Sequence, residues 1–188
     1  MAADLNKLSL EKLGELFPVT IVEYNPKWPR IFFEEKEIIQ AVVGINNIIR
    51  IEHIGSTAIP GLAAKPTIDI LIEIEDNTGK DIIIEYLKSI GYHFIPKPEN
   101  PPPHMMFAKG YSEKGYAGQT YHIHIRYKGD WHEITFRDYL LNHPETALKY
   151  AELKYKLAAD YINDREAYTE SKTEFIKRVL HTARKAKG

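Results

Sequence analysis

The chain has 188 residues, and its 44% hydrophobic and 27% charged content is ordinary for a globular protein. A formal net charge of −1 excludes the large single-sign field of a dedicated nucleic-acid binder, and the absence of cysteine excludes disulfides, thiolate zinc sites and a cysteine nucleophile. No signal segment is visible, and no apolar run approaches the roughly 20 residues that span a bilayer. We therefore expect a cytoplasmic protein whose partners are neither membranes nor nucleic acids.

The N-terminal quarter predicts a helix, a short strand and a second helix. The first helix ends before Pro18, whose nitrogen cannot donate to a helix ladder. Residues 19–23 are rich in β-branched side chains and are strand-like. Asn25 and Pro26 are typical of a helix start, and apolar residues at helical spacing continue this helix to Gly44.

Two strands and a helix are expected next. Residues 48–54 and 67–74 are apolar runs that favour buried strands. Thr78 and Asp81 resemble a capping box at the start of a helix that Gly91 ends.

The following segment predicts three more strands. Residues 92–95 and 104–108 are strand candidates, and residues 111–118 are turn-prone and expected to be mobile. Residues 119–127 alternate clearly, so that His122, His124 and Arg126 share one face of the strand.

The C-terminal third is helical from residue 133 onward, and Pro144 and Asp164 mark the starts of two long helices. Strands followed by a run of helices predict an α+β fold with a mostly antiparallel or mixed sheet. We expect one domain, built from a helical extension (1–18), an α/β core (19–132) and C-terminal helices packed on that core (133–188).

The first candidate site is the turn after residues 48–54. Gly55 allows a close backbone approach, and Ser56, with Thr57 after it, adds hydroxyl groups that can face a phosphate. Lys65 could pair with the same phosphate, and Asp69 is a hard oxygen ligand suited to Mg²⁺. The alternative is an ordinary turn with a solvated lysine.

The second candidate is the pair His122 and His124, whose i, i+2 spacing places two imidazoles on one strand face. If Asp69 lies on an adjoining strand, the three side chains could form a two-histidine, one-carboxylate metal cluster, and His53 is a fourth candidate ligand. The alternative is a pair of sheet histidines hydrogen-bonded to their neighbours.

The third candidate is a set of cations in the helical tail. Lys154 and Lys172 lie on helices with apolar stripes and could point at the sheet as phosphate clamps, and Arg137 and Arg165 are nearby cations of the same kind. The alternative is that these side chains are solvated.

Six short motifs together resemble one known family. They are VEYNPKWP at residues 22–29, HIGSTAIPGLAAKP at 53–66, DIL at 69–71, HIH at 122–124, FRDYL at 136–140 and HP at 143–144. In these motifs the chain resembles the GrpB family of small bacterial proteins, and the resemblance covers nearly the whole chain. It implies the nucleotidyltransferase-like fold, a mixed sheet flanked by helices.

The resemblance also implies a site and exposes a departure from it. Nucleotidyltransferase-like enzymes carry a Gly-Ser turn followed by two acids at alternating strand positions, and often a third acid on a later strand. Gly55, Ser56 and Asp69 match this pattern, but Leu71 stands at the second acidic position and Glu73 lies two residues further along. His122 and His124 occupy the place of the third acid.

Three functions follow from the resemblance and the residues. The first is a nucleotidyltransferase in which Ser56 and backbone amides hold the β- and γ-phosphates, Lys65 neutralises charge, and Asp69 with His122 or His124 places a divalent metal (Mg²⁺, Mn²⁺ or Zn²⁺). The second is a non-catalytic protein that binds a nucleotide or another phosphorylated metabolite. The third is a metal-dependent hydrolase that uses the His/Asp cluster. A homodimer is left open.

Overall fold

A mixed five-stranded sheet forms the centre of the computed structural model, which describes residues 8–76, 78–97, 100 and 103–186. Strands β2 and β5 pair in parallel, and the other neighbours are antiparallel. The order across the sheet is β1 (Ile48–Ile54), β2 (Thr67–Ile74), β5 (Gly115–Tyr127), β4 (Met105–Ser112) and β3 (His93–Ile95). The predicted α+β fold with a mixed sheet is confirmed.

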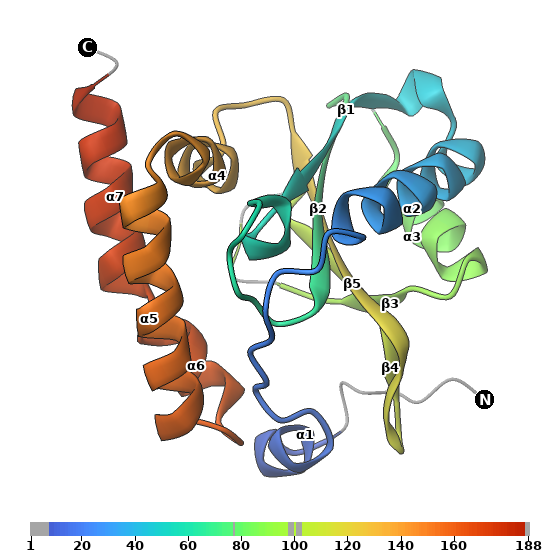
Figure 1. Ribbon diagram of the computed structural model, residues 1–188. Coiled ribbons are helices and arrows are strands. Elements are labelled where there is room, and N and C mark those ends of the chain that lie inside the picture. The colour runs from blue at the N-terminus through green and yellow to red at the C-terminus, as the bar shows by residue number, and fades with distance from the viewer. Residues whose placement is uncertain (1–7, 77, 98–99, 101–102, 187–188) are drawn as a thin grey trace.

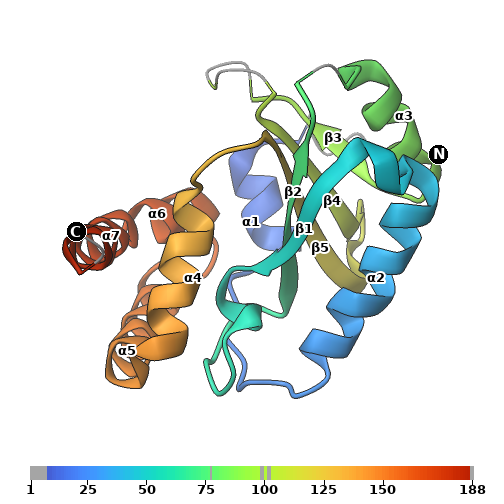
Figure 2. The same ribbon diagram turned by 90° about the horizontal axis from the view of Figure 1, so that it is seen from above.

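The helices are divided between the two faces of the sheet (Figure 1). Helices α2 (Trp28–Val43) and α3 (Lys80–Ser89) cover one face. The C-terminal helices lie on the other side, and Figure 2 shows α1 between them and the sheet. The helices on this side of the sheet are the N-terminal α1 (Leu10–Leu16) and the C-terminal α4 (His132–Asn142), α5 (Pro144–Asp160), α6 (Arg165–Glu170) and α7 (Thr173–Lys185).

The main core lies between the sheet and the pair α2 and α3. Ile70 and Ile72 of β2 are fully buried in it, and Trp28 at the start of α2 is only 1% exposed. Because strand side chains alternate between faces, this arrangement turns Asp69, Leu71 and Glu73 toward the C-terminal helices.

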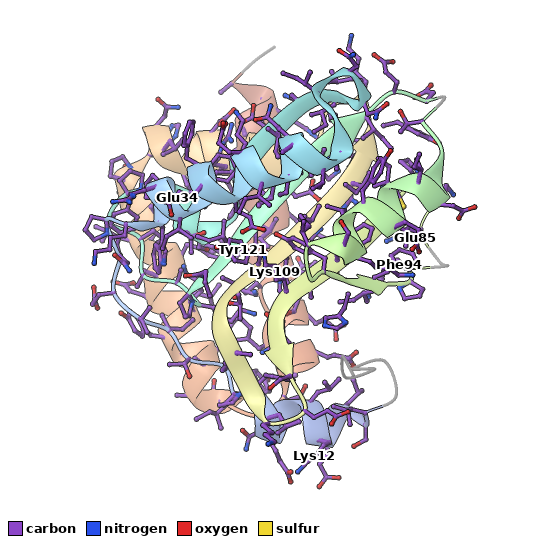
Figure 3. The ribbon with its side chains drawn as sticks, turned by 90° about the vertical axis from the view of Figure 1, so that its right-hand side faces the viewer. Lys12, Glu34, Glu85, Phe94, Lys109 and Tyr121 are labelled. Atoms are coloured by element: carbon purple, nitrogen blue, oxygen red, sulfur yellow. The ribbon has the colours of Figure 1, made fainter. Side chains whose placement is uncertain are left out.

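A charged cluster also lies on the α2 side of the sheet, and Figure 3 labels its residues Lys109 and Tyr121. Glu35 of α2 is 4% exposed and accepts hydrogen bonds from Lys109 Nζ (2.7 Å) and from the hydroxyl of Tyr92 (3.1 Å). The Lys109 ammonium lies 5.3 Å from the ring centre of Tyr121. A buried carboxylate paired in this way is part of the packing of α2 on the sheet.

Three local expectations were wrong. Residues 19–23 form only one isolated bridge, between Val22 and Ala64, because Val19 hydrogen-bonds instead to Ile162 and the segment does not follow a single strand. No capping box forms, since Gly79 takes the N-cap position of α3 without a side-chain hydrogen bond. The turn-prone segment 111–118 is the end of a β-hairpin, in which β4 runs to Ser112 and β5 begins at Gly115.

The helical tail follows the prediction for Pro144, which begins the long helix α5. Asp164 caps a helix as expected, and its side chain accepts from the backbone of Ala167. That helix is the short α6, which ends at Glu170, and a separate helix, α7, begins at Thr173. Within the described residues, no helix combines the length and apolarity that crossing a bilayer requires.

Helix α1 packs closely on the C-terminal region through Gly14. A Cβ atom at this position would overlap the carbonyl oxygen of Asn163, in the loop between α5 and α6. We therefore expect Gly14→Ala to lower the free energy of unfolding in urea by about 1–3 kcal/mol, as overpacking does. The control is Gly79→Ala, where the nearest atom to the new Cβ would be 3.7 Å away in Ile82. The decrease in the free energy of unfolding should be smaller for Gly79→Ala than for Gly14→Ala. Equal losses would contradict this close packing of α1.

Candidate functional site

A cavity of about 1000 Å³ lies on the sheet face opposite α2 and α3. Its walls come from α1, from strands β2, β4 and β5, and from the C-terminal helices α5 and α6. This volume is at the upper end of the range for small-molecule sites. The cavity contains most of the side chains that the sequence motifs single out.

Asp69 and the two histidines of β5 meet on the floor of the cavity. The parallel register of β2 and β5 sets Asp69 opposite His122. The Nδ1 atom of His122 lies 3.2 Å from Oδ1 of Asp69, and Nε2 of His124 lies 4.0 Å from the same oxygen. The three side chains are therefore neighbours, as the two-histidine, one-carboxylate hypothesis requires.

The charge state of this group follows from its partners. Burial opposes ionisation of Asp69, but the hydrogen bond from His122 and the proximity of His124 outweigh burial and lower the pKa of the carboxyl below its usual range. Burial lowers the pKa of His122 despite the neighbouring Asp69. We therefore take Asp69 as a carboxylate and His122 as a neutral imidazole.

Tyr111 completes the arrangement from β4. Its hydroxyl lies 2.9 Å from Nε2 of His122. Because the Asp69 carboxylate only accepts hydrogen bonds, Nδ1 of His122 carries the proton and Nε2 accepts from the Tyr111 hydroxyl. Both ring nitrogens of His122 are thus engaged, so His122 holds Asp69 in place and has no free lone pair for a metal.

The Gly-Ser turn packs directly against Asp69. Gly55 follows β1 with a φ of 71°, a conformation that favours glycine, and a Cβ here would lie 2.5 Å from Oδ2 of Asp69. Ser56 begins a short 3₁₀ turn (Ser56–Ala58) and lines the cavity beside Gly55. Thr57 also lines the cavity, but it is 1% exposed and its hydroxyl donates to the carbonyl of Thr67 (3.1 Å).

Three lysines line the cavity, Lys154 from α5, Lys172 from the segment between α6 and α7, and Lys65 from the loop before β2. Lys154 of α5 is only 2% exposed and donates to the carbonyl of Ala63, while its ammonium lies 4.8 Å from the ring centre of Tyr150. The ammonium groups of Lys65 and Lys172 lie 5.2 Å and 4.2 Å from the ring centre of Tyr168. Lys172 lies in the short segment between α6 and α7, and this interruption of the helix brings its side chain to the cavity.

These lysines are short of negative partners. Burial, together with repulsion from neighbouring cations, lowers the pKa of both Lys65 and Lys154 to about 7. Burial and the charge of Arg165 lower the pKa of Lys172 to about 8, against the opposing effect of Asp69. Lys154 contacts a carbonyl oxygen and all three ammonium groups lie over tyrosine rings, which offset a positive charge only in part. The two carboxylates Glu166 and Glu170 also line the cavity, but both are solvent-exposed.

Two predicted site residues lie elsewhere. His53 points to the α2 side of the sheet, where its ring stacks on Phe32 at 4.7 Å and burial lowers its pKa to about 4. Arg137 donates to Glu52 (2.7 Å) and to the carbonyl of His53 (2.8 Å). Neither side chain lines the cavity. We therefore exclude both from the site that we propose below.

The donor atoms do not fit the two-metal arrangement that the fold resemblance implies. Leu71 stands fully buried at the second acidic position. Glu73 is held by two hydrogen bonds from Arg50 (2.7 and 2.8 Å) and by the backbone N–H of Gly129. Among the described residues, no group of three or more histidine, cysteine or acidic side chains is arranged to hold a metal ion. The Asp69 carboxylate lines the cavity and could contact a single hard cation together with ligand oxygens.

Three further features of the site were missed. Tyr111 lies in the segment taken as a mobile turn, and Tyr150 is one of several apolar residues along α5. Neither carries a sequence signal that separates it from core residues. The participation of α1 in the cavity wall was also unforeseen, because an amphipathic stripe does not say which surface it covers.

The mixed sheet with helices on both faces is a nucleotidyltransferase-like fold. Two structures of the Cid1 poly(U) polymerase share the fold, one in complex with its short product ApU and one bound to MgGTP. Their TM-scores are 0.52 and 0.51 at 12% sequence identity, and the matches cover 80% and 75% of this chain and 48% and 45% of theirs. At this identity the likeness shows the fold alone.

The chain belongs to the GrpB family, whose profile, described as GrpB protein, matches residues 18–182. The crystal structure of the conserved protein GrpB from Enterococcus faecalis has a TM-score of 0.76 and 31% identity, and the match covers 89% of this chain and 98% of that one. UPF0157 proteins of Pseudomonas aeruginosa and Bacillus subtilis are each 40% identical, over 88% and 90% of this chain. The chain spans 67% and 48% of the length of these two relatives.

Proposed function

We propose that the cavity binds the phosphate groups of a nucleotide or of another phosphorylated metabolite. The observation that carries this proposal is the convergence of Lys65, Lys154 and Lys172, three amines whose pKa values fall to about 7 or 8, on one cavity. A polyanion would supply the negative charge that these amines lack. A purely structural role would be expected to pair them with carboxylates instead.

The contacts can be assigned from the wall positions. The three ammonium groups donate to phosphate oxygens, as do the Ser56 hydroxyl and the backbone N–H groups of its turn. The Gly55 position keeps the turn free of a side chain at the point nearest Asp69. The ligand thus lies above the Asp69–His122 pair.

The proposal is tested by isothermal titration of the full chain with ATP, UTP and inorganic tripolyphosphate, in EDTA and in excess Mg²⁺. We expect heat of binding with at least one of these probes already in EDTA, because the lysines need no metal to contact phosphate. Failure of all three probes to bind or to raise the melting temperature under either condition would refute phosphate recognition.

Phosphate binding should depend on pH through the lysines. Below pH 7 all three amines are charged before the ligand arrives, and above their lowered pKa values binding must first restore the lost protons. The terminal phosphate of ATP is already ionised near pH 7, with a pKa of about 6. We therefore expect the affinity for ATP to fall between pH 8 and pH 9 by about tenfold for each lysine that must regain a proton.

Proton uptake gives the matching measurement. Titrations at pH 8 in buffers of different ionisation enthalpy should show net uptake of protons by the complex, since binding raises the lysine pKa values toward their usual range. An affinity that stays constant from pH 7 to pH 9, with no proton uptake, would contradict the assignment of these lysines as phosphate ligands.

A second candidate function is nucleotidyl transfer, which the position of Asp69 favours. The carboxylate of Asp69 lies beside the Gly55–Ser56 turn, on the cavity face of the sheet of a nucleotidyltransferase-like fold. In this reaction an acceptor hydroxyl would attack the α-phosphorus, pyrophosphate would leave, and the hydroxyl proton would pass to a base. A divalent cation bound by Asp69 and phosphate oxygens would neutralise charge at the phosphates. The geometry gives less support to a His/Asp metal-dependent hydrolase, because both nitrogens of His122 are already engaged.

A further inference from the structure

The lining of the cavity changes from polar to mainly apolar between one edge of the sheet and the other. Near β1 and β2 it is lined by Ser56, Asp69 and the lysines. The sheet order then brings β5, β4 and β3, and beyond His124 the next lining residues across the register are Met106 and Ile95. Lys97, which follows β3, also lines the cavity at this end but is exposed to solvent. The strand residues that line the cavity beyond the histidines are apolar, and we call this part the apolar end.

Helix α1 supplies the facing wall of the apolar end. Leu10, Leu13 and Phe17 line the cavity from α1 and the residue after it. Phe17 is 2% exposed and packs edge-on against Tyr111, which fixes this wall to the same residue that holds His122. Leu10 is 61% exposed although it lines the cavity, so the fold leaves a large apolar side chain uncovered at this end.

We infer that the ligand is a soluble phosphate ester whose organic part is mainly apolar. This inference rests on the phosphate site of the proposed function and names the class of ligand. The phosphate would lie at Lys65, Lys154 and Lys172, and the apolar body would extend past Asp69 between α1 and strands β3 and β4. One continuous cavity with cations at one end and aliphatic walls at the other complements such an amphipathic molecule in both charge and polarity.

The test uses alkyl phosphates of increasing length, from methyl to hexyl phosphate, titrated into the full chain at pH 6.5. The phosphate head is constant in this series, so any change in affinity reports on the apolar body. We expect the dissociation constant to fall by up to about fourfold for each added methylene. An affinity that is the same for methyl and hexyl phosphate would overturn the inference.

Two leucines of α1 provide a matched pair of variants. Leu13 and Leu16 are both partly buried and pack on the same cluster, but only Leu13 lines the cavity. Leu13→Ala should reduce the gain in affinity per methylene that is measured between methyl and hexyl phosphate. Leu16→Ala should keep the wild-type gain, and equal effects of the two variants would remove α1 from the ligand site. Circular dichroism spectra of both variants should match that of the wild type, which checks that they are folded.

The failure of this inference can be distinguished from the failure of the phosphate site. If tripolyphosphate and methyl phosphate bind but longer chains bring no gain, the apolar body is wrong and the phosphate site stands. If none of the phosphate probes binds, the proposed function itself fails. Sedimentation with phosphatidic acid vesicles separates a soluble ligand from a lipid surface, and vesicle binding without a gain along the soluble series would overturn the inference.

Discussion

Lys154→Met is expected to weaken ATP binding at pH 6.5 by about 30-fold or more. Lys154 is 2% exposed and lines the cavity, so its contact with phosphate would be shielded from water. Removing one partner of a buried, hydrogen-bonded charge pair typically costs about 2–5 kcal/mol of binding free energy, and 2 kcal/mol corresponds to roughly 30-fold. Isothermal titration in EDTA measures the loss without a contribution from metal ions.

The same substitution should shift stability in a pH-dependent way. Burial lowers the pKa of Lys154 from 10.5 in the unfolded chain to about 7 in the folded protein. Between these values the unfolded chain binds more protons, so the lysine makes stability rise as the pH increases from about 7 to about 10.5. Methionine has no such dependence. The stability of the variant relative to wild type should therefore be more favourable at pH 6 than at pH 9.

Lys156→Met is the matched control for Lys154→Met, because Lys156 lies two residues away on the same helix and is exposed to solvent. It should change neither ATP affinity nor the pH dependence of stability appreciably. If Lys154→Met bound ATP as tightly as Lys156→Met does, Lys154 would be only a buried structural lysine whose partner is the carbonyl of Ala63.

The secondary structure near the site could be predicted because its signals are local. Apolar runs correctly predicted both β1 and β2, and Pro144 correctly predicted the start of α5. The hairpin at residues 111–118 could not be predicted in this way. Its glycines favour a turn, but hydrogen bonds between β4 and β5 extend both strands past them, and those bonds depend on a partner that the local pattern does not reveal.

The site itself depended on register, which the sequence alone does not specify. Asp69 meets His122 only because β2 and β5 pair in parallel with these residues opposite each other. The same register logic separates His53 from the site. The antiparallel pairing of β1 with β2 sets Ile54 opposite Asp69, so that His53, one residue earlier, faces α2 instead. A shift of one residue in either pair would have reversed these positions.

The charges of the helical tail illustrate a second limit. Arg137, Lys154 and Lys172 are equivalent in sequence, since each is a basic residue on or beside a helix with apolar neighbours. Only the packing of the C-terminal helices on the sheet brings Lys154 and Lys172 to the cavity and leaves Arg137 in an ion pair with Glu52. Long-range packing of this kind cannot be derived from helical periodicity.

Asp69→Asn is expected to change ATP binding in opposite directions with and without Mg²⁺. In EDTA the substitution removes a negative charge from a site that we propose binds a polyanion. Binding should then tighten by about tenfold, the effect of roughly 1.4 kcal/mol of repulsion at an effective dielectric constant near 20. The measurement is best made below pH 6.5, because loss of the Asp69 charge lowers the pKa values of Lys65 and Lys172 further and at higher pH would cost these lysines their protons.

In Mg²⁺ the same variant should lose whatever affinity the metal adds in the wild type, because the amide of asparagine is a weaker ligand for a hard cation than a carboxylate. If the chain transfers nucleotidyl groups, release of pyrophosphate in Mg²⁺ should also fall by on the order of 10²-fold or more. The control is Glu166→Gln, which removes one negative charge from the cavity rim, where Glu166 is exposed and lies on α6 rather than beside the turn. A Mg²⁺-dependent gain that survives Asp69→Asn would place the cation elsewhere. If the wild-type protein binds ATP equally well with and without Mg²⁺ and releases no pyrophosphate, Asp69 does not bind a cation and the protein only binds phosphate ligands. Asp69 would then be a negative charge beside the ligand that His122 and Tyr111 hold in place.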